Sequence, residues 1–251
     1  MKDLFIGISS SVGRYFVNDF YYNSVFTHYK NQINNSIRFN LLEDNIEDFV
    51  NLKEFKNVFI LSAVSDPNEC FNKKKFTKKF NVESTKKLLM NIFKHNCTIF
   101  FFSTEFIYDG VKGDYNENDI ANPILEYGKQ KLNIENFITD NYDNFVIYRL
   151  AKTYTNKLNE KSLISNWYEH FILNKHQEVD IANDQIFSPI FANDLPKISK
   201  TLIKNDFKGK INIGGSEALS RLDCLRIFIE IFKVKNVIIN KKSINNFNLP
   251  E

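Results

Sequence analysis

The chain has 251 residues, of which 43% are hydrophobic and 15% aromatic, which excludes a disordered protein and allows a substantial core. Its 33 Lys and Arg residues and 30 Asp and Glu residues leave a net charge of +3, with the two signs interspersed. We therefore expect no nucleic-acid partner and interpret the densest basic run, residues 73–79, as the solvated face of a helix.

Cysteine and histidine usage excludes two further classes of protein. Cys70, Cys97 and Cys224 are odd in number and form no CxxC pair, which argues against a disulfide framework or a zinc site and fits a reducing cytosol. The four histidines show no metal-ligand spacing, so we expect no metal. No stretch is long enough for a membrane span or a signal peptide, so we predict a cytoplasmic protein with no membrane partner.

The first predicted element is a buried strand over residues 4–8. It breaks into the small-residue turn 9–13 before a predicted helix over 14–22. A strand, a turn and a helix N-terminus in this order form an anion site, because free N–H groups and the helix dipole face the turn. Gly7 and Gly13 have the spacing of a dinucleotide-binding turn, although Ser10 occupies the usual place of a middle glycine.

A second strand is predicted over residues 24–30, and the charges near its end bear on the cofactor. An Asp or Glu about 20 residues after the glycine turn would bind the ribose hydroxyls of NAD. None occurs between Tyr21 and Leu42, whereas Lys30 and Arg38 lie there. These basic groups favour the 2′-phosphate of NADP. The alternative, that they are exposed loop cations, remains open.

Further apolar runs alternate with helical patterns along the first 150 residues. Residues 57–63, 98–103 and 144–150 are predicted strands, and helices are predicted from about residue 76 and over 129–138. Strands that alternate with helices predict an α/β fold with a Rossmann-type, doubly wound parallel sheet.

The pattern Tyr-x-x-x-Lys occurs three times, starting at Tyr108, Tyr127 and Tyr148. Tyr108 runs into an Asp-Gly turn, and Tyr148 lies in a predicted strand, where residues four apart stand roughly 13 Å from each other. Only Tyr127 is followed by a helical pattern, in which Lys131 lies about 6 Å along the axis on the same face. The alternative is a half-buried tyrosine beside a lysine whose ammonium reaches solvent.

A phenol and an ammonium side by side can transfer a proton at neutral pH. The pKa of a free tyrosine is about 10, and a neighbouring cation favours the phenolate, so we expect Lys131 to lower the pKa of Tyr127. Thr104, or Ser103 beside it, ends the strand 98–103 and would hydrogen-bond the same carbonyl group.

Several segments share their order with one known family. Residues 61–70 look like its "AA-x-x-x-V-D-x-C-E" region, 81–85 are similar to "N-V-x-G-T", and 103–105 resemble "S-T-D". Tyr-Gly-x-x-Lys follows at 127–131, and 184–189 are close to "D-Q-x-G-x-P". The chain thus resembles the extended short-chain dehydrogenase/reductases, and within them the dTDP-4-dehydrorhamnose reductase family of dTDP-rhamnose biosynthesis.

The resemblance implies an oxidoreductase that passes hydride from NADPH, or alternatively NADH, to a 4-keto group on a nucleotide-linked 6-deoxy sugar. Tyr127 would protonate the alkoxide, Lys131 would bind ribose, and Thr104 would orient the carbonyl. The implied cofactor contacts are Gly7, Ser10, Ser11, Val12, Gly13, Lys30, Arg38, Ser62, Ala63, Tyr127 and Lys131. The implied substrate contacts are Ser103, Glu105, which replaces the usual Asp, and Lys152, which stands where these enzymes commonly have Trp.

The resemblance also sets expectations for domains and assembly. Residues 1–149 would form the NADP-binding domain, with 179–200 returning to it. Residues 150–178 and 201–251 would form a smaller substrate-binding lobe. The family often pairs through helices, so a homodimer is a candidate assembly. Two alternatives stay open: a non-catalytic subunit, like the regulatory subunit of methionine adenosyltransferase, and a nucleotide-sugar epimerase or dehydratase with bound NAD.

Overall fold

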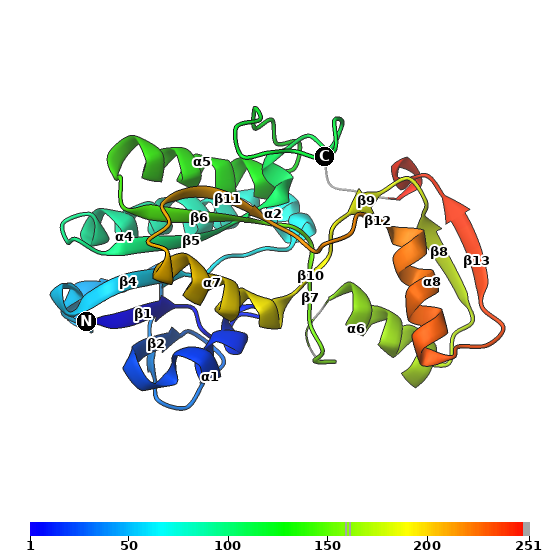
Figure 1. Cartoon of the computed structure of the whole chain (residues 1–251), viewed down its shortest axis with the longest axis horizontal. Helices are drawn as coiled ribbons and strands as arrows, with labels where there is room; N and C mark the ends of the chain where they lie inside the picture. The colour runs from blue at the N-terminus through cyan, green and yellow to red at the C-terminus, as the bar shows by residue number, and fades with distance from the viewer. Residues whose placement is uncertain (159, 161, 248–251) are drawn as a thin grey trace. The chain divides into compact units, whose positions relative to one another are not determined.

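Seven strands form one sheet in the order β11-β6-β5-β4-β1-β2-β3 (Figure 1). In this computed structural model, which describes residues 1–158, 160 and 162–247, all neighbouring strands from β3 to β6 run parallel. The order reverses at β1, as in a doubly wound Rossmann sheet, so the predicted fold class is confirmed. The strand bounds are β1 Lys2–Ile6, β2 Ser24–His28, β3 Ser36–Arg38, β4 Phe55–Ile60, β5 Thr98–Thr104, β6 Phe145–Leu150 and β11 Gly209–Ile213.

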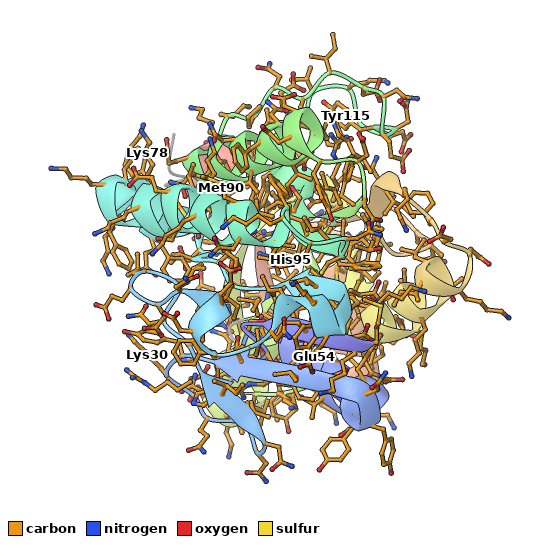
Figure 2. The ribbon with its side chains drawn as sticks, turned by 90° about the vertical axis from the view of Figure 1, so that its left-hand side faces the viewer. Lys30, Glu54, Lys78, Met90, His95 and Tyr115 are labelled. Atoms are coloured by element: carbon orange, nitrogen blue, oxygen red, sulfur yellow. The ribbon has the colours of Figure 1, made fainter. Side chains whose placement is uncertain are left out.

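The helices that connect these strands are interrupted more often than their sequence pattern predicts. The segment predicted as one helix over 14–22 is a short α1 between two 3₁₀ turns, and the helical stretch before β5 contains a π-helical segment, η5. In α4 Leu88 and Leu89 are buried, whereas Met90, labelled in Figure 2, is 57% exposed. The bounds are η1 Gly13–Tyr15, α1 Phe16–Phe20, η2 Tyr21–Asn23, η3 Ile46–Asp48, η4 Leu52–Glu54, α2 Pro67–Asn72, α3 Lys74–Lys78, η5 Lys79–Ser84, α4 Thr85–Ile92, η6 Glu105–Ile107, α5 Glu126–Asn141, η8 Ala192–Asp194 and α7 Leu195–Lys204.

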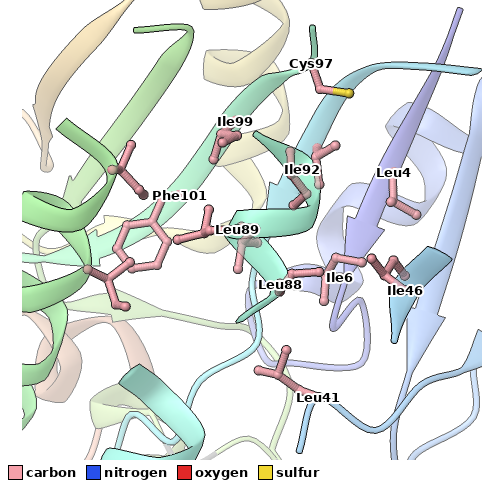
Figure 3. Packing of buried hydrophobic residues seen from close by; sticks show 14 of the residues in the cluster. Leu4, Ile6, Leu41, Ile46, Leu88, Leu89, Ile92, Cys97, Ile99 and Phe101 are labelled. Atoms are coloured by element: carbon pink, nitrogen blue, oxygen red, sulfur yellow. The ribbon is translucent and has the colours of Figure 1, made fainter. Parts of the chain in front are cut away.

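One face of the sheet carries mainly aliphatic side chains. Leu4 of β1 and Ile99 of β5 are fully buried in a cluster with Leu89 and Ile92 of α4 (Figure 3). Because side chains alternate along a strand, the strand residues next to Leu4 and Ile99 point to the other face of the sheet.

The other face is aromatic. Phe5 stacks on Phe59 with ring centroids 4.3 Å apart, and Phe59 stacks on Phe100 at 4.5 Å. Phe16 and Phe20 of α1 pack edge-on or tilted against the same rings. The apolar runs of β1, β4 and β5 are therefore buried on both faces, as central parallel strands are.

The chain divides into two compact units. The first comprises Met1–Leu150 together with Asn193–Asn212, and the second comprises Ala151–Ala192 and the described chain from Ile213 onward. The segment that returns to the first unit is thus 193–212, where the sequence predicted 179–200, because β8 pairs with β13 inside the second unit.

The second unit has a small core of its own. Trp167 and Phe171 pack with Leu225 and Phe228 of α8. Its elements are β7 Thr153–Tyr154, α6 Leu163–Tyr168, η7 Glu169–Leu173, β8 Glu178–Ala182, β9 Ile186–Phe187, β10 Ile190–Phe191, β12 Leu219–Ser220, α8 Arg221–Phe232, β13 Ile238–Lys242 and η9 Ile244–Asn246.

The described residues can also be compared with the expectations for disulfides, metal sites and membrane spans. All three cysteines are free and buried. Within the described residues, no group of three or more His, Cys, Asp or Glu side chains could hold a metal ion. None of the helices in this part of the chain combines the length and apolar character needed to cross a bilayer.

Candidate active site

The structure brings Tyr127 and Lys131 together on the buried side of α5. Tyr127 is 8% exposed and Lys131 is 4% exposed. The Lys131 Nζ lies 5.8 Å from the centroid of the Tyr127 ring and donates a hydrogen bond of 2.7 Å to the carbonyl oxygen of Phe102. It also lies 4.6 Å from the centroid of the Phe101 ring. The ammonium is therefore fixed between α5 and the carboxyl half of β5.

A glycine permits the close approach that positions Tyr127. A Cβ at Gly128 would lie 2.0 Å from the carbonyl oxygen of Phe106, which is shorter than any real contact. The Phe106 and Tyr127 rings then meet edge-on at 6.4 Å. Gly128 thus allows α5 to press against the segment that directly follows Thr104.

Burial dominates the electrostatics of the pair. It raises the pKa of the Tyr127 phenol, with the Cys70 thiol as a smaller cause in the same direction. It lowers the pKa of Lys131 to about 8, although Glu135 and Cys70 act in the opposite sense. The sequence predicted that Lys131 would lower the Tyr127 pKa, whereas desolvation of the charged form is the larger influence here. Tyr127 is therefore protonated at neutral pH and can donate a proton.

Thr104 and Ser103 end β5, and their hydroxyl groups make different hydrogen bonds. The Thr104 Oγ1 accepts a hydrogen bond of 3.3 Å from the backbone N–H of Phe106, which leaves its hydroxyl hydrogen available to an acceptor. The Ser103 hydroxyl, which the sequence suggested for the substrate, donates to the buried carboxylate of Glu135. Glu105 follows in η6, where its carbonyl oxygen accepts from Tyr108 N–H.

The predicted glycine turn lies at the same edge of the sheet, after β1. Gly7 has φ +87°, and a Cβ there would lie 2.1 Å from the Ser62 Oγ and 2.9 Å from the Ser62 backbone nitrogen. Only glycine therefore lets the turn after β1 touch the chain after β4, where Ala63 follows Ser62. Two of the predicted cofactor-binding segments are thus adjacent.

Ser10, the departure from the family pattern, has a structural role in this turn. Its Oγ accepts a hydrogen bond of 3.0 Å from the backbone N–H of Gly13, and its own N–H donates to the carbonyl oxygen of Gly7. The hydroxyl thus folds back onto the turn. Ser11 is exposed and Val12 half-buried in the same loop.

Asn81 holds the loop after β4, a role that sequence reasoning missed. Its side chain accepts from Val64 N–H at 2.8 Å and donates to Val64 carbonyl oxygen at 2.9 Å. It also donates to Gln130 Oε1 at 2.8 Å, and Gln130 immediately precedes Lys131. Asn81 lies in the π-helical segment η5, and such segments are frequent at functional sites. The "N-V-x-G-T" resemblance was the available signal.

Lys30 and Arg38 meet at the ends of β2 and β3. Lys30 Nζ and Arg38 Cζ each lie 5.8 Å from the centroid of the Tyr29 ring. Both side chains are exposed, and Figure 2 shows Lys30 at the outer surface of the first unit. The register pairs His28 with Arg38, so the strand β3, which the sequence did not predict, brings the two cations together.

Lys152, the remaining predicted contact, belongs to the second unit. Its carbonyl oxygen accepts from Ile190 N–H, beside the short pairing of β7 with β10. In the same unit, Arg221 Nε and Gln185 Oε1 are buried atoms with no hydrogen-bond partner among the described residues.

Comparisons with known proteins agree with this fold. A family profile described as the RmlD substrate binding domain matches residues 1–250. The dTDP-4-dehydrorhamnose reductase of Aggregatibacter actinomycetemcomitans is 28% identical over 122 residues, 47% of this chain and 39% of that protein. The methionine adenosyltransferase 2 subunit beta of Bos taurus is 21% identical over 204 residues, 78% of this chain and 60% of that one. The chain thus spans 39% to 60% of the length of these two curated relatives.

Two solved structures share the whole fold. A hypothetical dTDP-4-dehydrorhamnose reductase from Sulfolobus tokodaii superposes with a TM-score of 0.85 at 24% identity, covering 100% of this chain and 90% of that one. The dTDP-4-dehydrorhamnose reductase of Bacillus anthracis in complex with NADP has a TM-score of 0.83 at 15% identity and covers 98% and 86%.

Proposed function

The chain belongs to the RmlD substrate binding domain family, and we propose that it is an NADPH-dependent reductase of a nucleotide-linked 4-keto-6-deoxy sugar. The observation that carries this proposal is the arrangement of Tyr127 and Lys131 on α5 against the strand end that bears Thr104. In open α/β sheets this carboxyl edge is where ligands bind.

The residues at this edge suit a dinucleotide. The turn after β1 and the loop after β4 approach at Gly7 and Ser62, where a Cβ would fill the space. Lys30 and Arg38 offer two exposed cations at the ends of β2 and β3, which supports a 2′-phosphate and hence NADP. The relative from Bacillus anthracis was solved with NADP.

The chain's own residues supply the rest of the chemistry. When bound, a reduced nicotinamide dinucleotide supplies the hydride that the ketone carbon accepts. Thr104 donates its hydroxyl hydrogen to the ketone oxygen, and Tyr127 gives its phenolic proton to that oxygen as negative charge develops. Burial keeps Tyr127 protonated until then. Lys131 places a positive charge beside the phenolate that remains.

The second unit contains a candidate anion-binding residue of its own. Its half-buried Arg221 has an Nε with no hydrogen-bond partner within the described chain, and desolvation lowers its pKa. An unpartnered guanidinium of this kind suits the diphosphate of a nucleotide sugar.

We infer a cytoplasmic location from three free, buried cysteines.

Turnover tests the proposal directly. The protein is supplied with NADPH and a set of 4-keto-6-deoxy sugar nucleotides that differ in their base, and the absorbance of the reduced cofactor is followed. We expect turnover with at least one, and a loss of about 100-fold or more in Lys131→Ala. Lys129→Ala, an exposed lysine on the same helix, is the matched control and keeps its activity. No turnover with any substrate by the wild type contradicts the proposal.

A second candidate is a non-catalytic nucleotide-binding subunit. The match to methionine adenosyltransferase 2 subunit beta over 78% of the chain favours it, and so does the Ser10 hydroxyl folded onto Gly13 N–H. In that case the protein binds NADPH without oxidising it and co-purifies with a second protein. A related epimerase or dehydratase would instead retain tightly bound NAD on isolation.

A further inference from the structure

We propose, on the basis of the reductase function above, that the buried Glu135–Arg149 pair is a positioning device that holds Lys131 in its charged form beside Tyr127. Glu135 is completely buried and Arg149 is 3% exposed. Neither residue is among the predicted catalytic or cofactor-binding groups. Both act through other residues, so we call them positioning residues.

The geometry of the pair leaves neither side chain free to move. Arg149 donates two hydrogen bonds to one carboxylate oxygen of Glu135, from Nε at 3.1 Å and from a terminal nitrogen at 2.9 Å. The other carboxylate oxygen accepts from the Ser103 hydroxyl. Glu135 follows Lys131 by one helical turn, on the same face of α5. A single carboxylate therefore connects the catalytic helix with the ends of β5 and β6.

Arg149 extends the same network into the loop between β5 and α5. Its second terminal nitrogen donates to the Tyr108 hydroxyl at 2.8 Å and to the carbonyl oxygen of Glu117 at 3.0 Å. Tyr108 in turn donates to Asn116 carbonyl oxygen and stacks on Tyr115 with ring centroids 4.4 Å apart. The loop that follows Thr104 is thus tied to the helix that carries Tyr127.

A pair of this kind contributes little to stability as such. The desolvation of two charges offsets much of their attraction, and replacement by apolar residues is often neutral or stabilising. Its value must then lie in what the charges do to their neighbours. The neighbour that carries a charge and lies one turn away is Lys131, a residue that is 4% exposed.

The charged and titratable groups around Lys131 come from four elements. Glu135 and Tyr127 share α5 with it, and Cys70 lies on α2. β5 contributes the carbonyl oxygen of Phe102 and the ring of Phe101, and Arg149 on β6 lies behind Glu135. Of these, Glu135 is the carboxylate, so it opposes the loss of the Lys131 charge on burial.

The test measures the ionisation of Lys131 in the free protein by NMR of ¹³C-labelled lysine. The Lys131 resonance is assigned by its disappearance in Lys131→Met. In Glu135→Gln we expect the titration midpoint of Lys131 to fall by about one pH unit or more. Glu135→Asp, which keeps the negative charge, keeps the titration midpoint of Lys131 close to its wild-type value. Asp140→Asn removes an exposed carboxylate from the same helix and leaves the midpoint in place.

A second variant separates positioning from folding. Glu135→Gln alone leaves Arg149 buried without its partner and can unfold the protein. The double variant Glu135→Gln/Arg149→Met removes both charges, and we expect it to fold and to show a fall in the Lys131 midpoint that is smaller than in Glu135→Gln, because the positive charge of Arg149 is removed as well. A folded double variant with an unchanged Lys131 midpoint overturns the proposal. Wild-type inactivity toward every ketone would count only against the reductase function, because this titration needs neither cofactor nor substrate.

Discussion

Two regions at the carboxyl edge of the sheet carry charged side chains, and they differ in burial. At the ends of β2 and β3, Lys30 and Arg38 are exposed and both lie against the ring of Tyr29. At the ends of β5 and β6, Lys131 and Arg149 are buried and hydrogen-bonded to fixed oxygen atoms. The same residue types therefore meet two different environments within one sheet.

The difference teaches what each region can do. A solvated cation attracts a phosphate but is screened by salt and remains mobile, so it contributes affinity. A buried cation cannot move without losing its partners, so it contributes position. We expect changes in the buried region to affect folding and rate strongly, and changes in the exposed region to affect cofactor affinity alone and more weakly.

Gly128→Ala should disrupt the buried region most. The new Cβ would lie 2.0 Å from the Phe106 carbonyl oxygen, so α5 must shift away from the Thr104 strand end. We expect a loss of about 3 kcal/mol in the free energy of unfolding, despite the better helix propensity of alanine. Denaturant unfolding measures it.

Gly113→Ala is the matched control for that change. Gly113 has φ +70°, but a Cβ there would meet no atom within 4 Å, so only backbone strain of about 1 kcal/mol applies. Equal losses in the two variants would show that the close approach at Gly128 is unimportant.

Asn81→Ala should loosen the loop that carries Ser62 and Ala63. It leaves the backbone groups of Val64 and the amide of Gln130 without their partner, at a cost of about 2 kcal/mol. The dissociation constant for NADPH, measured by fluorescence titration, should rise as well. Asn133→Ala, on the exposed side of α5, is the control. An unchanged dissociation constant for NADPH would show that the hydrogen bonds of Asn81 do not affect cofactor binding.

The pH dependence of stability reports the burial of Lys131. Burial lowers its pKa from 10.5 to about 8, so between these values the unfolded chain binds more protons than the folded one. The free energy of unfolding contributed by Lys131 therefore increases with pH in this window, by about 3 kcal/mol. In Lys131→Met this increase is absent, whereas the pH dependence of the free energy of unfolding that comes from Tyr127 remains. Parallel stability curves for the wild type and this variant would mean that the ammonium is solvated.

The double variant Lys30→Ala/Arg38→Ala addresses the exposed region. Removing two cations should weaken NADPH binding about tenfold, or about 1.4 kcal/mol, while NADH binding and the free energy of unfolding stay constant. High salt should reduce the difference between wild type and variant. An equal loss of affinity for NADPH and NADH would show that Lys30 and Arg38 do not bind the 2′-phosphate.

The elements and pairs that sequence reasoning predicted are those set by local pattern. The apolar runs of β1, β4 and β5 and the spacing of Tyr127 and Lys131 on one helix need only the periods of strands and helices. Glu135 and Arg149 are 14 residues apart, and Asn81 and Gln130 are 49 apart. Nothing in the local pattern of either pair shows that the chain brings them together.

Burial, strand length and long-range strand pairing explain the other differences from expectation. The charge of Lys131 was expected to lower the Tyr127 pKa, but the desolvation of both groups depends on how tightly α5 packs on β5. The strand β3 has three residues, too few for a periodic signal. β8 stays in the second unit because it pairs with β13, whose partners are about 60 residues apart, whereas β11 returns the chain to the large sheet beside β6.

The central claim is that Tyr127 gives the proton to the reduced ketone, and a single-turnover measurement tests it most directly. Wild type, Tyr127→Phe and Tyr22→Phe are each saturated with NADPH, mixed with the sugar-nucleotide ketone that the wild type reduces, and followed by the loss of reduced-cofactor absorbance. We predict that Tyr127→Phe binds NADPH normally but oxidises it about 100-fold or more slowly, whereas Tyr22→Phe, altered at a 98% exposed side chain, matches the wild type. A Tyr127→Phe protein that oxidises the cofactor at the wild-type rate would contradict the account.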